Sequence, residues 1–124
     1  MVPFIKSSTP QELGKQGEAY ARKYLLSKGY KILHQNWRYK HLEVDLIAKK
    51  ENRIIFIEVK TRLSDISNVE ELISANKERS LLQALNVYMA HNKEDVFCQI
   101  DLLLLRKNVT SFEVRHLQNA IGMH

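Results

Sequence analysis

Three charged residues lie inside two segments that otherwise have the pattern of strands in a hydrophobic sheet. Asp45 interrupts the alternating stretch 42–48, and Glu58 and Lys60 interrupt the apolar stretch 53–61. Charged side chains are seldom buried without a partner, because removing them from water costs several kcal/mol. Carboxylates are ligands of Mg²⁺, and a lysine can stabilise the charge that grows on a phosphate during hydrolysis. These three residues are therefore our first candidates for a functional site.

The two segments are separated only by residues 49–52, so we expect a tight antiparallel hairpin. The pairs that this hairpin predicts are Lys50–Arg53, Ala48–Ile55 and Leu46–Ile57. Continued further, the register places Asp45 opposite Glu58 and Glu43 opposite Lys60, with all four side chains on one face. Opposed carboxylates repel, and a divalent cation between them would remove the repulsion. The pattern leaves a second interpretation open, in which Glu43 and Lys60 form an ordinary cross-strand pair and Asp45 lies in solvent.

A further carboxylate, Glu18, lies on a segment with helical periodicity. Thr9, Pro10 and Glu12 predict a helix start with a capping box, and Gly29 predicts its end. On this helix Glu18 lies at the edge of the apolar stripe, so it could reach the sheet as a third carboxylate. Spacing alone favours the alternative, a solvated helix glutamate.

The remaining elements follow from hydrophobic periodicity and turn residues. After the first helix we expect strands at 30–39, 42–48 and 53–61, a mobile polar loop at 62–76, a helix at 77–92, strands at 96–106 and 109–117, and a helical turn at 118–122. In the second strand the alternation predicts that one face is shared by Leu42, Val44, Leu46 and Ala48. This order predicts one α/β domain over residues 1–124, with residues 1–8 disordered and helices flanking a mixed sheet of about five strands.

The composition favours a polyanionic partner. Lys and Arg number 19 against 14 Asp and Glu among 124 residues, giving a net charge of +5. Phosphate neutralisation releases counterions, so a basic protein of this kind favours nucleic acid. The lone cysteine, Cys98, excludes an intrachain disulfide, and no apolar run approaches the roughly 20 residues of a membrane-spanning helix. The start of the chain also lacks the apolar core of a signal peptide, so we expect a cytoplasmic protein without membrane contact.

An ordered set of motifs covers nearly the whole chain. It comprises Gly14-x-x-Gly17-Glu18, Gly29-Tyr30-x-Ile32-Leu33-x-x-Asn36-x-Arg38, Glu43-Val44-Asp45, Glu58-Val59-Lys60-Thr61-Arg62, Lys77 with Leu81, Ala84 and Tyr88, and Ile100-Asp101 with 117–121. This set resembles the YraN-like family of small bacterial proteins. That family belongs to the restriction-endonuclease-like superfamily, in which an acidic residue is followed by Glu-x-Lys on the next strand, and it is similar to archaeal Holliday-junction resolvases. The resemblance implies a restriction-endonuclease-like fold.

The resemblance also implies roles for individual residues. Asp45 and Glu58 would hold Mg²⁺ or Mn²⁺, with the backbone carbonyl of Val59 as a further ligand. Lys60 would be the catalytic lysine. Glu18 would correspond to the first-helix glutamate that completes such sites in resolvase-like proteins.

Two positions depart from the family pattern. Leu42 stands where the family usually has glycine, and Gln99 stands where it often has arginine. Neither position carries a proposed ligand. The lost arginine could weaken a phosphate contact or change the setting of Asp101.

Basic residues near the motifs are candidates for contacts to nucleic acid, with an ordinary exposed face as the alternative. They are Arg38, Lys40, Arg62, Lys77 and Arg79. Our leading hypothesis is a metal-dependent endonuclease that hydrolyses DNA, on branched or damaged structures. Two other hypotheses stay open: a nucleic-acid-binding protein that does not cut, and a protein-interaction scaffold whose charged face is structural. Resolvase-like proteins act as symmetric dimers, so the resemblance also allows a homodimer.

Overall fold

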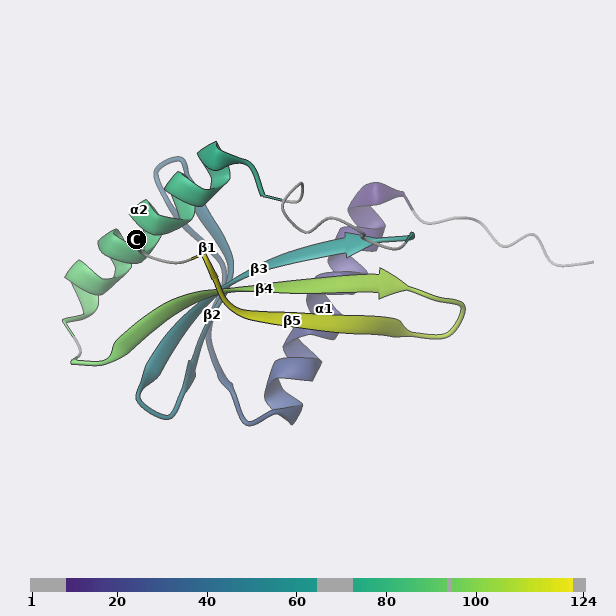
Figure 1. The fold of residues 1–124 in the computed structure, drawn as a ribbon, viewed down its shortest axis with the longest axis horizontal. Helices are drawn as coiled ribbons and strands as arrows, with labels where there is room; N and C mark the ends of the chain where they lie inside the picture. Colours follow the sequence, from purple (N-terminus) through teal and green to yellow (C-terminus); the bar gives the residue numbers. More distant parts are fainter. Residues whose placement is uncertain (1–8, 65–72, 94, 122–124) are drawn as a thin grey trace, which may run out of the picture.

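The computed structural model describes residues 9–64, 73–93 and 95–121. Two helices and five strands follow one another along this part of the chain (Figure 1). Their bounds are α1 Pro10–Ser27, β1 Lys31–Tyr39, β2 Leu42–Lys50, β3 Arg53–Arg62, α2 Ala75–Asn92, β4 Phe97–Lys107 and β5 Phe112–Ile121. The predicted order of one helix, three strands, one helix and two strands is confirmed.

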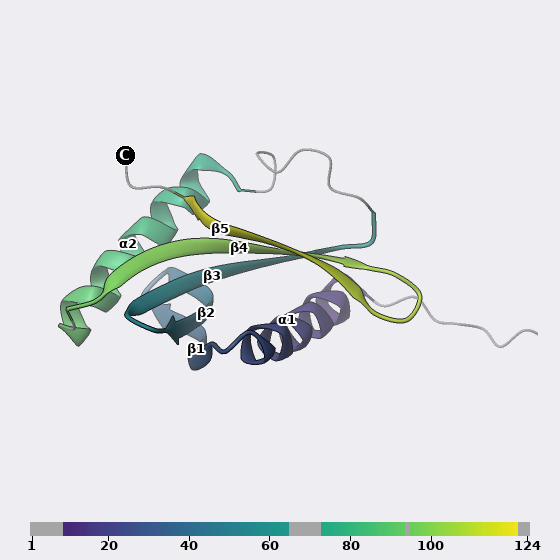
Figure 2. The ribbon, with the colours of Figure 1, turned by 60° about the horizontal axis from the view of Figure 1, so that its bottom comes forward.

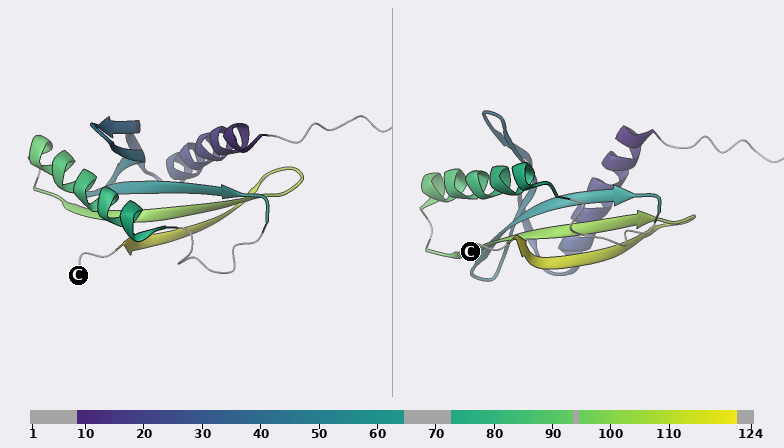
Figure 3. Two further views of the ribbon diagram at one scale, coloured as in Figure 1. Left: turned by 90° about the horizontal axis from the view of Figure 1, so that it is seen from above. Right: turned by 45° about the horizontal axis from the view of Figure 1, so that its top comes forward.

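The five strands form one sheet in the order β1-β2-β3-β4-β5. Neighbouring strands are antiparallel except β3 and β4, which are parallel. A parallel pair needs a crossover connection, and α2 lies in this one. Figures 2 and 3 show α1 on one face of the sheet and α2 on the other. The mixed five-stranded sheet with flanking helices, expected of a restriction-endonuclease-like domain, is confirmed.

Each helix covers its own hydrophobic cluster. The α1 cluster includes Ala21, Leu25, Leu46, Ala48, Ile55, Ile57, Val59, Leu103 and Leu105. The α2 cluster includes Leu42, Val44, Ile47, Ile54, Phe56, Leu81, Ala84, Leu85, Tyr88 and Ile100. Strand β3 supplies alternate residues to both clusters, which makes it a central, covered strand. By the same alternation, Glu58 and Lys60 lie on the α2 side of β3.

Helix α1 begins as predicted and lies very close to β3. Thr9 and Glu12 form the capping box, and Gly29 after the helix has a left-handed φ of 88°. Midway along α1, a Cβ atom placed on Gly17 would lie 1.9 Å from Oγ1 of Thr61. Only glycine permits this approach, so Gly17 brings α1, and with it the next residue Glu18, directly onto the end of β3.

The last described residues differ from the expectation. The predicted helical turn at 118–122 is wrong for its described part, because β5 continues to Ile121. Asn119 has a left-handed φ of 51°, and its backbone N–H donates a hydrogen bond of 2.8 Å to Oδ1 of Asp101. The pairing of β4 with β5 also shifts between Ile100 and Leu102. The segment predicted as a helical turn is therefore an irregular strand.

Two expectations fall wholly or largely outside the described residues: disorder at 1–8 and the mobile loop at 62–76. At the described ends of that loop, β3 extends to Arg62 and α2 begins at Ala75. Ser74 caps α2, because its Oγ accepts a hydrogen bond of 3.1 Å from the backbone N–H of Lys77. Within residues 9–64, 73–93 and 95–121, no helix combines the length and the apolar character that a membrane crossing requires.

Candidate functional site

Strand β2 changes face at Asp45. The prediction that four apolar residues of β2 share one face is wrong, because they divide between the two clusters as Leu46 with Ala48 and Leu42 with Val44. On β1, Asn36 lies between the residues that pair with Leu46 and Val44, and it has a left-handed φ of 50°. This irregularity lets both strands bend together, and the bend takes Asp45 out of simple alternation.

The Asp45 carboxylate bonds to the backbone of β3. The predicted hairpin pairs from Lys50–Arg53 to Leu46–Ile57 are confirmed, and the paired register ends there. Beyond it, Oδ2 of Asp45 accepts a hydrogen bond of 2.8 Å from the backbone N–H of Val59. The expectation that Asp45 and Glu58 are directly opposed ladder partners is therefore wrong. The Asp45 side chain instead satisfies a β3 donor where the β2 backbone no longer pairs with it.

Glu43 lies outside this acidic site. Its carboxylate forms an ion pair of 3.0 Å with Arg38 on β1, and both side chains are more than half exposed. Neither the predicted four-residue face nor the alternative pair between Glu43 and Lys60 is therefore present. The residues left for a common site are Asp45, Glu58 and Lys60.

Glu58 is a buried carboxylate between two lysines. Only 4% of the residue is exposed. Nζ of Lys60 lies 3.6 Å from its Oε1, and Nζ of Lys77 lies 3.4 Å from its Oε2. Both contacts are ion pairs. The contact of Lys77 with Oε2 lacks the geometry of a hydrogen bond, so this buried oxygen accepts no hydrogen bond from the described residues. Burial, followed by the negative charge of Asp45, raises the pKa of Glu58 from 4.5 to about 7, against the opposing effect of the two lysines.

Lys77 is the member of the site that the sequence did not assign to Glu58. The sequence predicts it as a nucleic-acid contact on the second helix. The structure brings it to Glu58 because the first turn of α2 lies beside Glu58 of β3. No residue spacing signals this contact, since residues 63–74 separate the two elements and periodicity does not show how the elements pack.

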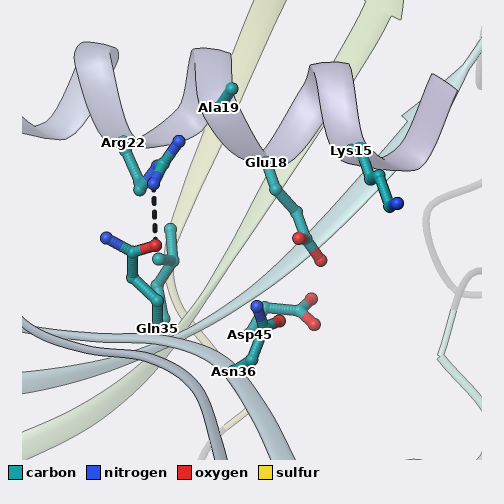
Figure 4. A pocket seen from close by; sticks show the side chains of 8 residues that line it. Lys15, Glu18, Ala19, Arg22, Gln35, Asn36 and Asp45 are labelled. Atoms are coloured by element: carbon teal, nitrogen blue, oxygen red, sulfur yellow. Dashed lines mark hydrogen bonds between the residues drawn. The ribbon is translucent and has the colours of Figure 1, made fainter. Parts of the chain in front are cut away.

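Glu18 faces Asp45 from α1. Both residues line a pocket of about 210 Å³ between α1 and the bend of β1 and β2, and Figure 4 shows the Glu18 side chain pointing toward Asp45. Burial, followed by the charge of Asp45, raises the pKa of Glu18, and Arg22 opposes the shift. Within the described ranges, however, no three His, Cys, Asp or Glu side chains are grouped so that they could hold a metal ion together. The structure therefore brings Asp45 toward Glu58 and toward Glu18 without gathering all three predicted ligands.

The residues present fit a divalent cation held by two carboxylates. Asp45 raises the pKa of Glu58, as expected for two acidic groups that approach each other in a buried setting. Oε2 of Glu58 is a buried oxygen for which the described residues supply no hydrogen-bond donor. A Mg²⁺ site commonly uses one or two protein carboxylates and completes its shell with water and substrate. The Val59 carbonyl stays a predicted ligand, whereas the N–H of that residue donates to Asp45.

The other predicted nucleic-acid residues make their described contacts with neighbouring residues and not with Glu58 or Asp45. Arg38 is paired with Glu43, Lys40 lies over the Tyr39 ring at 5.5 Å, Arg62 donates to the Thr61 carbonyl and Arg79 donates to Asn76. Of the five predicted contacts, Lys77 alone has an ion pair with one of the proposed catalytic residues. The contacts of the remaining four to nucleic acid stay predictions about a wider binding surface.

Gln99 contacts the acidic residue that follows it by two positions. Its Nε2 donates a hydrogen bond of 2.8 Å to Oδ1 of Asp101, and its Oε1 accepts one of 2.7 Å from Arg53. Asp101 is fully buried and also contacts Nε2 of His116 at 2.7 Å. The glutamine thus supports Asp101 directly and has an arginine beside it. Asp101 belongs to a network that links β4 with β5, separate from the contacts of Glu58.

Comparisons with known proteins place the chain among small bacterial relatives. The profile of a family described as "Uncharacterised protein family UPF0102" matches residues 17–119. A UPF0102 protein of Flavobacterium johnsoniae is 40% identical over 114 residues, covering 88% of this chain and 93% of its own length. A UPF0102 protein of Parabacteroides distasonis is 36% identical over 110 residues, covering 88% and 91%. Neither name states an activity.

Among solved structures, the chain is similar to SfsA of Pyrococcus furiosus, determined in complex with Ca²⁺. The TM-score is 0.40 and the sequence identity is 14%. The similarity covers 91% of this chain and 65% of that one. The function must therefore be argued from the residues of the site.

Proposed function

This chain belongs to UPF0102, an uncharacterised protein family, and from that premise we propose that it is a metal-dependent endonuclease that hydrolyses DNA phosphodiester bonds. The resemblance to the YraN-like family is confirmed by these matches, whereas the activity is our inference. One observation carries it: Glu58, a carboxylate that is only 4% exposed, lies beside a second carboxylate and two lysines, and one of its buried oxygens accepts no hydrogen bond from the part of the chain that the structure describes. A purely structural role for this group would leave that oxygen unsatisfied.

Asp45 and Glu58 would hold the ion, Mg²⁺ or Mn²⁺, with the Val59 carbonyl as the further ligand that the resemblance implies. When bound, such an ion supplies positive charge to a phosphate oxygen and favours hydroxide over water as the nucleophile. The hydrogen bond from Val59 to Asp45 fixes one carboxylate oxygen and leaves the other available. The protein therefore orients this ligand through the backbone of β3.

The lysines and Glu18 would act on the substrate side of the same site. Lys60 carries its ammonium group 3.6 Å from Glu58, where it could stabilise charge that grows on the phosphate. Lys77 favours the ionised form of Glu58. Glu18 faces Asp45, and a carboxylate with a raised pKa suits a group that takes a proton from an attacking water.

Cleavage of defined DNA substrates tests this proposal. Linear duplex, branched and nicked DNA are incubated with the protein and Mg²⁺ or Mn²⁺, and products are resolved on denaturing gels. We expect cleavage that Asp45→Asn and Lys60→Ala abolish, while Glu43→Gln, an exposed position of β2, keeps it. Activity that survives both of the first two substitutions would show that another site, or a contaminant, cuts the DNA.

A second candidate function is nucleic-acid binding without cleavage. It is favoured by the two lysines at Glu58, whose ammonium groups offset part of its charge. Binding that is sensitive to salt, independent of metal and free of products would support this alternative.

The proposal also concerns where the protein acts and in what state. We place it in the cytoplasm, because a lone cysteine suits a reducing compartment and the proposed substrate is DNA. Cutting both strands of a duplex would require two active sites, so we further propose that a homodimer acts on such substrates.

A further inference from the structure

A groove continues from the carboxylates along α1. The pocket that contains Glu18 and Asp45 adjoins a second cavity of about 390 Å³. Both cavities are lined by Ala19, Arg22 and Gln35, so they are parts of one depression between α1 and β1. The second cavity adds two lysines and two apolar side chains, namely Lys23, Lys31, Leu26 and Ile32.

A side-chain bridge marks the boundary between the two cavities. Nη1 of Arg22 donates a hydrogen bond of 2.7 Å to Oε1 of Gln35, and Figure 4 shows this bond joining α1 to β1. The bond uses one of the five N–H donors of the guanidinium group. It holds the planar group at the boundary, with donors left for a phosphate or a base.

The charge along the groove is mixed in its first part and positive in its second part. The first part has the carboxylates of Glu18 and Asp45 together with Lys15, whereas the second part has Lys23 and Lys31, both exposed. Within the part of the chain that the structure describes, no ion pair engages either lysine. Leu26, which is 57% exposed, and Ile32 supply apolar surface between these charges. Alternating cationic and apolar groups match the phosphates and bases of a single strand.

We propose that this groove binds an unpaired strand of nucleic acid that leads away from the scissile phosphate. This inference rests on the proposed function, because the groove begins at the proposed catalytic carboxylates. Lys23 and Lys31 would contact phosphates, while Arg22, Leu26 and Ile32 would contact the base faces. The two cavities, of about 210 and 390 Å³, are no larger than small-molecule pockets, which occupy about 300–1,000 Å³, so they suit nucleotides in single file rather than a duplex.

Equilibrium binding without cleavage tests the inference. Fluorescence anisotropy is measured in EDTA with the full chain, using a labelled single-stranded oligonucleotide without secondary structure and the duplex of the same sequence. We expect Lys23→Gln and Lys31→Gln each to weaken single-strand binding about fivefold and to lower the slope of log affinity against log salt by about 0.7. The matched control is Lys93→Asn, which removes one charge from the end of α2 and keeps a residue that tolerates the left-handed φ of 46° found there.

The two groove variants should leave duplex affinity within twofold of the wild type. The inference is overturned if they weaken single-strand binding no more than Lys93→Asn does, or if they weaken duplex binding equally. Because EDTA removes metal-dependent cutting from the measurement, its outcome is separate from that of the cleavage assay. Lysine-dependent single-strand binding without cleavage in Mg²⁺ or Mn²⁺ would sink only the proposed nuclease, whereas cleavage without this dependence would sink only the groove.

Discussion

The carboxylate of Asp45 accepts a hydrogen bond of 2.8 Å from the backbone N–H of Val59, at the point where the ladder between β2 and β3 has ended. One side chain thus replaces a missing backbone acceptor and lies beside Glu58 at the same time. The hydrogen bond ties the position of a proposed metal ligand to the integrity of β3. Structural and catalytic roles of Asp45 can therefore be separated by two substitutions at this position.

Asp45→Ala should destabilise the fold, whereas Asp45→Asn should not. Alanine leaves the Val59 N–H without an acceptor, which costs about 1–3 kcal/mol for a buried group and less where water can enter. Asparagine keeps an acceptor oxygen and removes the charge that raises the pKa of Glu58. Urea unfolding at pH 7 measures both effects. Equal destabilisation by the two substitutions would show that charge, not the hydrogen bond, is what the fold requires.

Glu58 should make stability fall as the pH rises. Its pKa is raised to about 7 in the fold from 4.5, so the folded chain binds this proton more tightly than the unfolded chain does. Its contribution is thus fully present below about pH 4.5 and is lost as the pH rises through about 7. The free energy of unfolding of the wild type minus that of Glu58→Gln should fall across this window. A difference that stays flat from pH 4.5 to 8 would contradict the raised pKa.

A divalent cation should reverse this loss at alkaline pH. At pH 8, Mg²⁺ or Mn²⁺ at 100 times its Kd is expected to add about 2.7 kcal/mol to the free energy of unfolding, because it binds the folded chain. Differential scanning fluorimetry detects the rise in Tm. Glu43→Gln should keep the rise and Asp45→Asn should lose it. An equal rise in both variants would place the ion elsewhere.

Lys77→Met should raise the pKa of Glu58 further, because it removes a positive charge beside the carboxylate. It should lower the free energy of unfolding at pH 8 by about 1–2 kcal/mol, because the buried Glu58 carboxylate loses an ion pair that solvent screens in part. Arg79→Met on the same turn of α2 is the matched control, because Arg79 contacts Asn76 and no residue of the acidic site. Unfolding curves at pH 5 and pH 8 compare the two. The stability gap between them should shrink at pH 5, where Glu58 is largely protonated. A gap of equal size at both pH values would argue for lost packing instead.

Two glycines of α1 should respond in opposite ways to alanine. At Gly17 a Cβ atom would lie 1.9 Å from Oγ1 of Thr61, so Gly17→Ala must displace α1 at a cost of about 1–3 kcal/mol. At Gly14 nothing lies within 4 Å of the added atom, and Gly14→Ala should stabilise the helix by up to about 1 kcal/mol. Thermal unfolding distinguishes them. Because Gly17 also positions Glu18, its variant should lose cleavage as well. Full cleavage activity of Gly17→Ala would show that the reaction does not depend on the position of Glu18.

Local patterns predicted much of this molecule. Capping residues located α1, and the short connection after Lys50 fixed the hairpin register down to Leu46 and Ile57. Alternation failed at Asp45, because a bend shared with Asn36 changes which face the next residues occupy. A bend of this kind depends on two strands together, and neither strand's own pattern reveals it.

Contacts between residues far apart in the sequence were the second feature that local patterns did not predict. Lys77 meets Glu58 only because α2 crosses the sheet, and Asp101 meets His116 only because β5 pairs with β4. Periodicity can identify each of these elements, but it carries no information about which of their side chains meet. The sequence identified the motif residues, whereas only the structure shows which charged residues lie beside them.

The parallel pairing of β3 with β4 has a consequence for the time course of folding. The hairpins of β1, β2 and β3 join residues that are near in sequence, whereas β4 can reach β3 only after the chain has closed the long loop through α2. Until then Glu58 has neither its cover nor Lys77, so its carboxylate has the acidity of a solvated group. We therefore expect proton uptake by Glu58 to accompany the last stage of assembly, and a pH-indicator signal in a stopped-flow refolding experiment to lag behind hairpin formation.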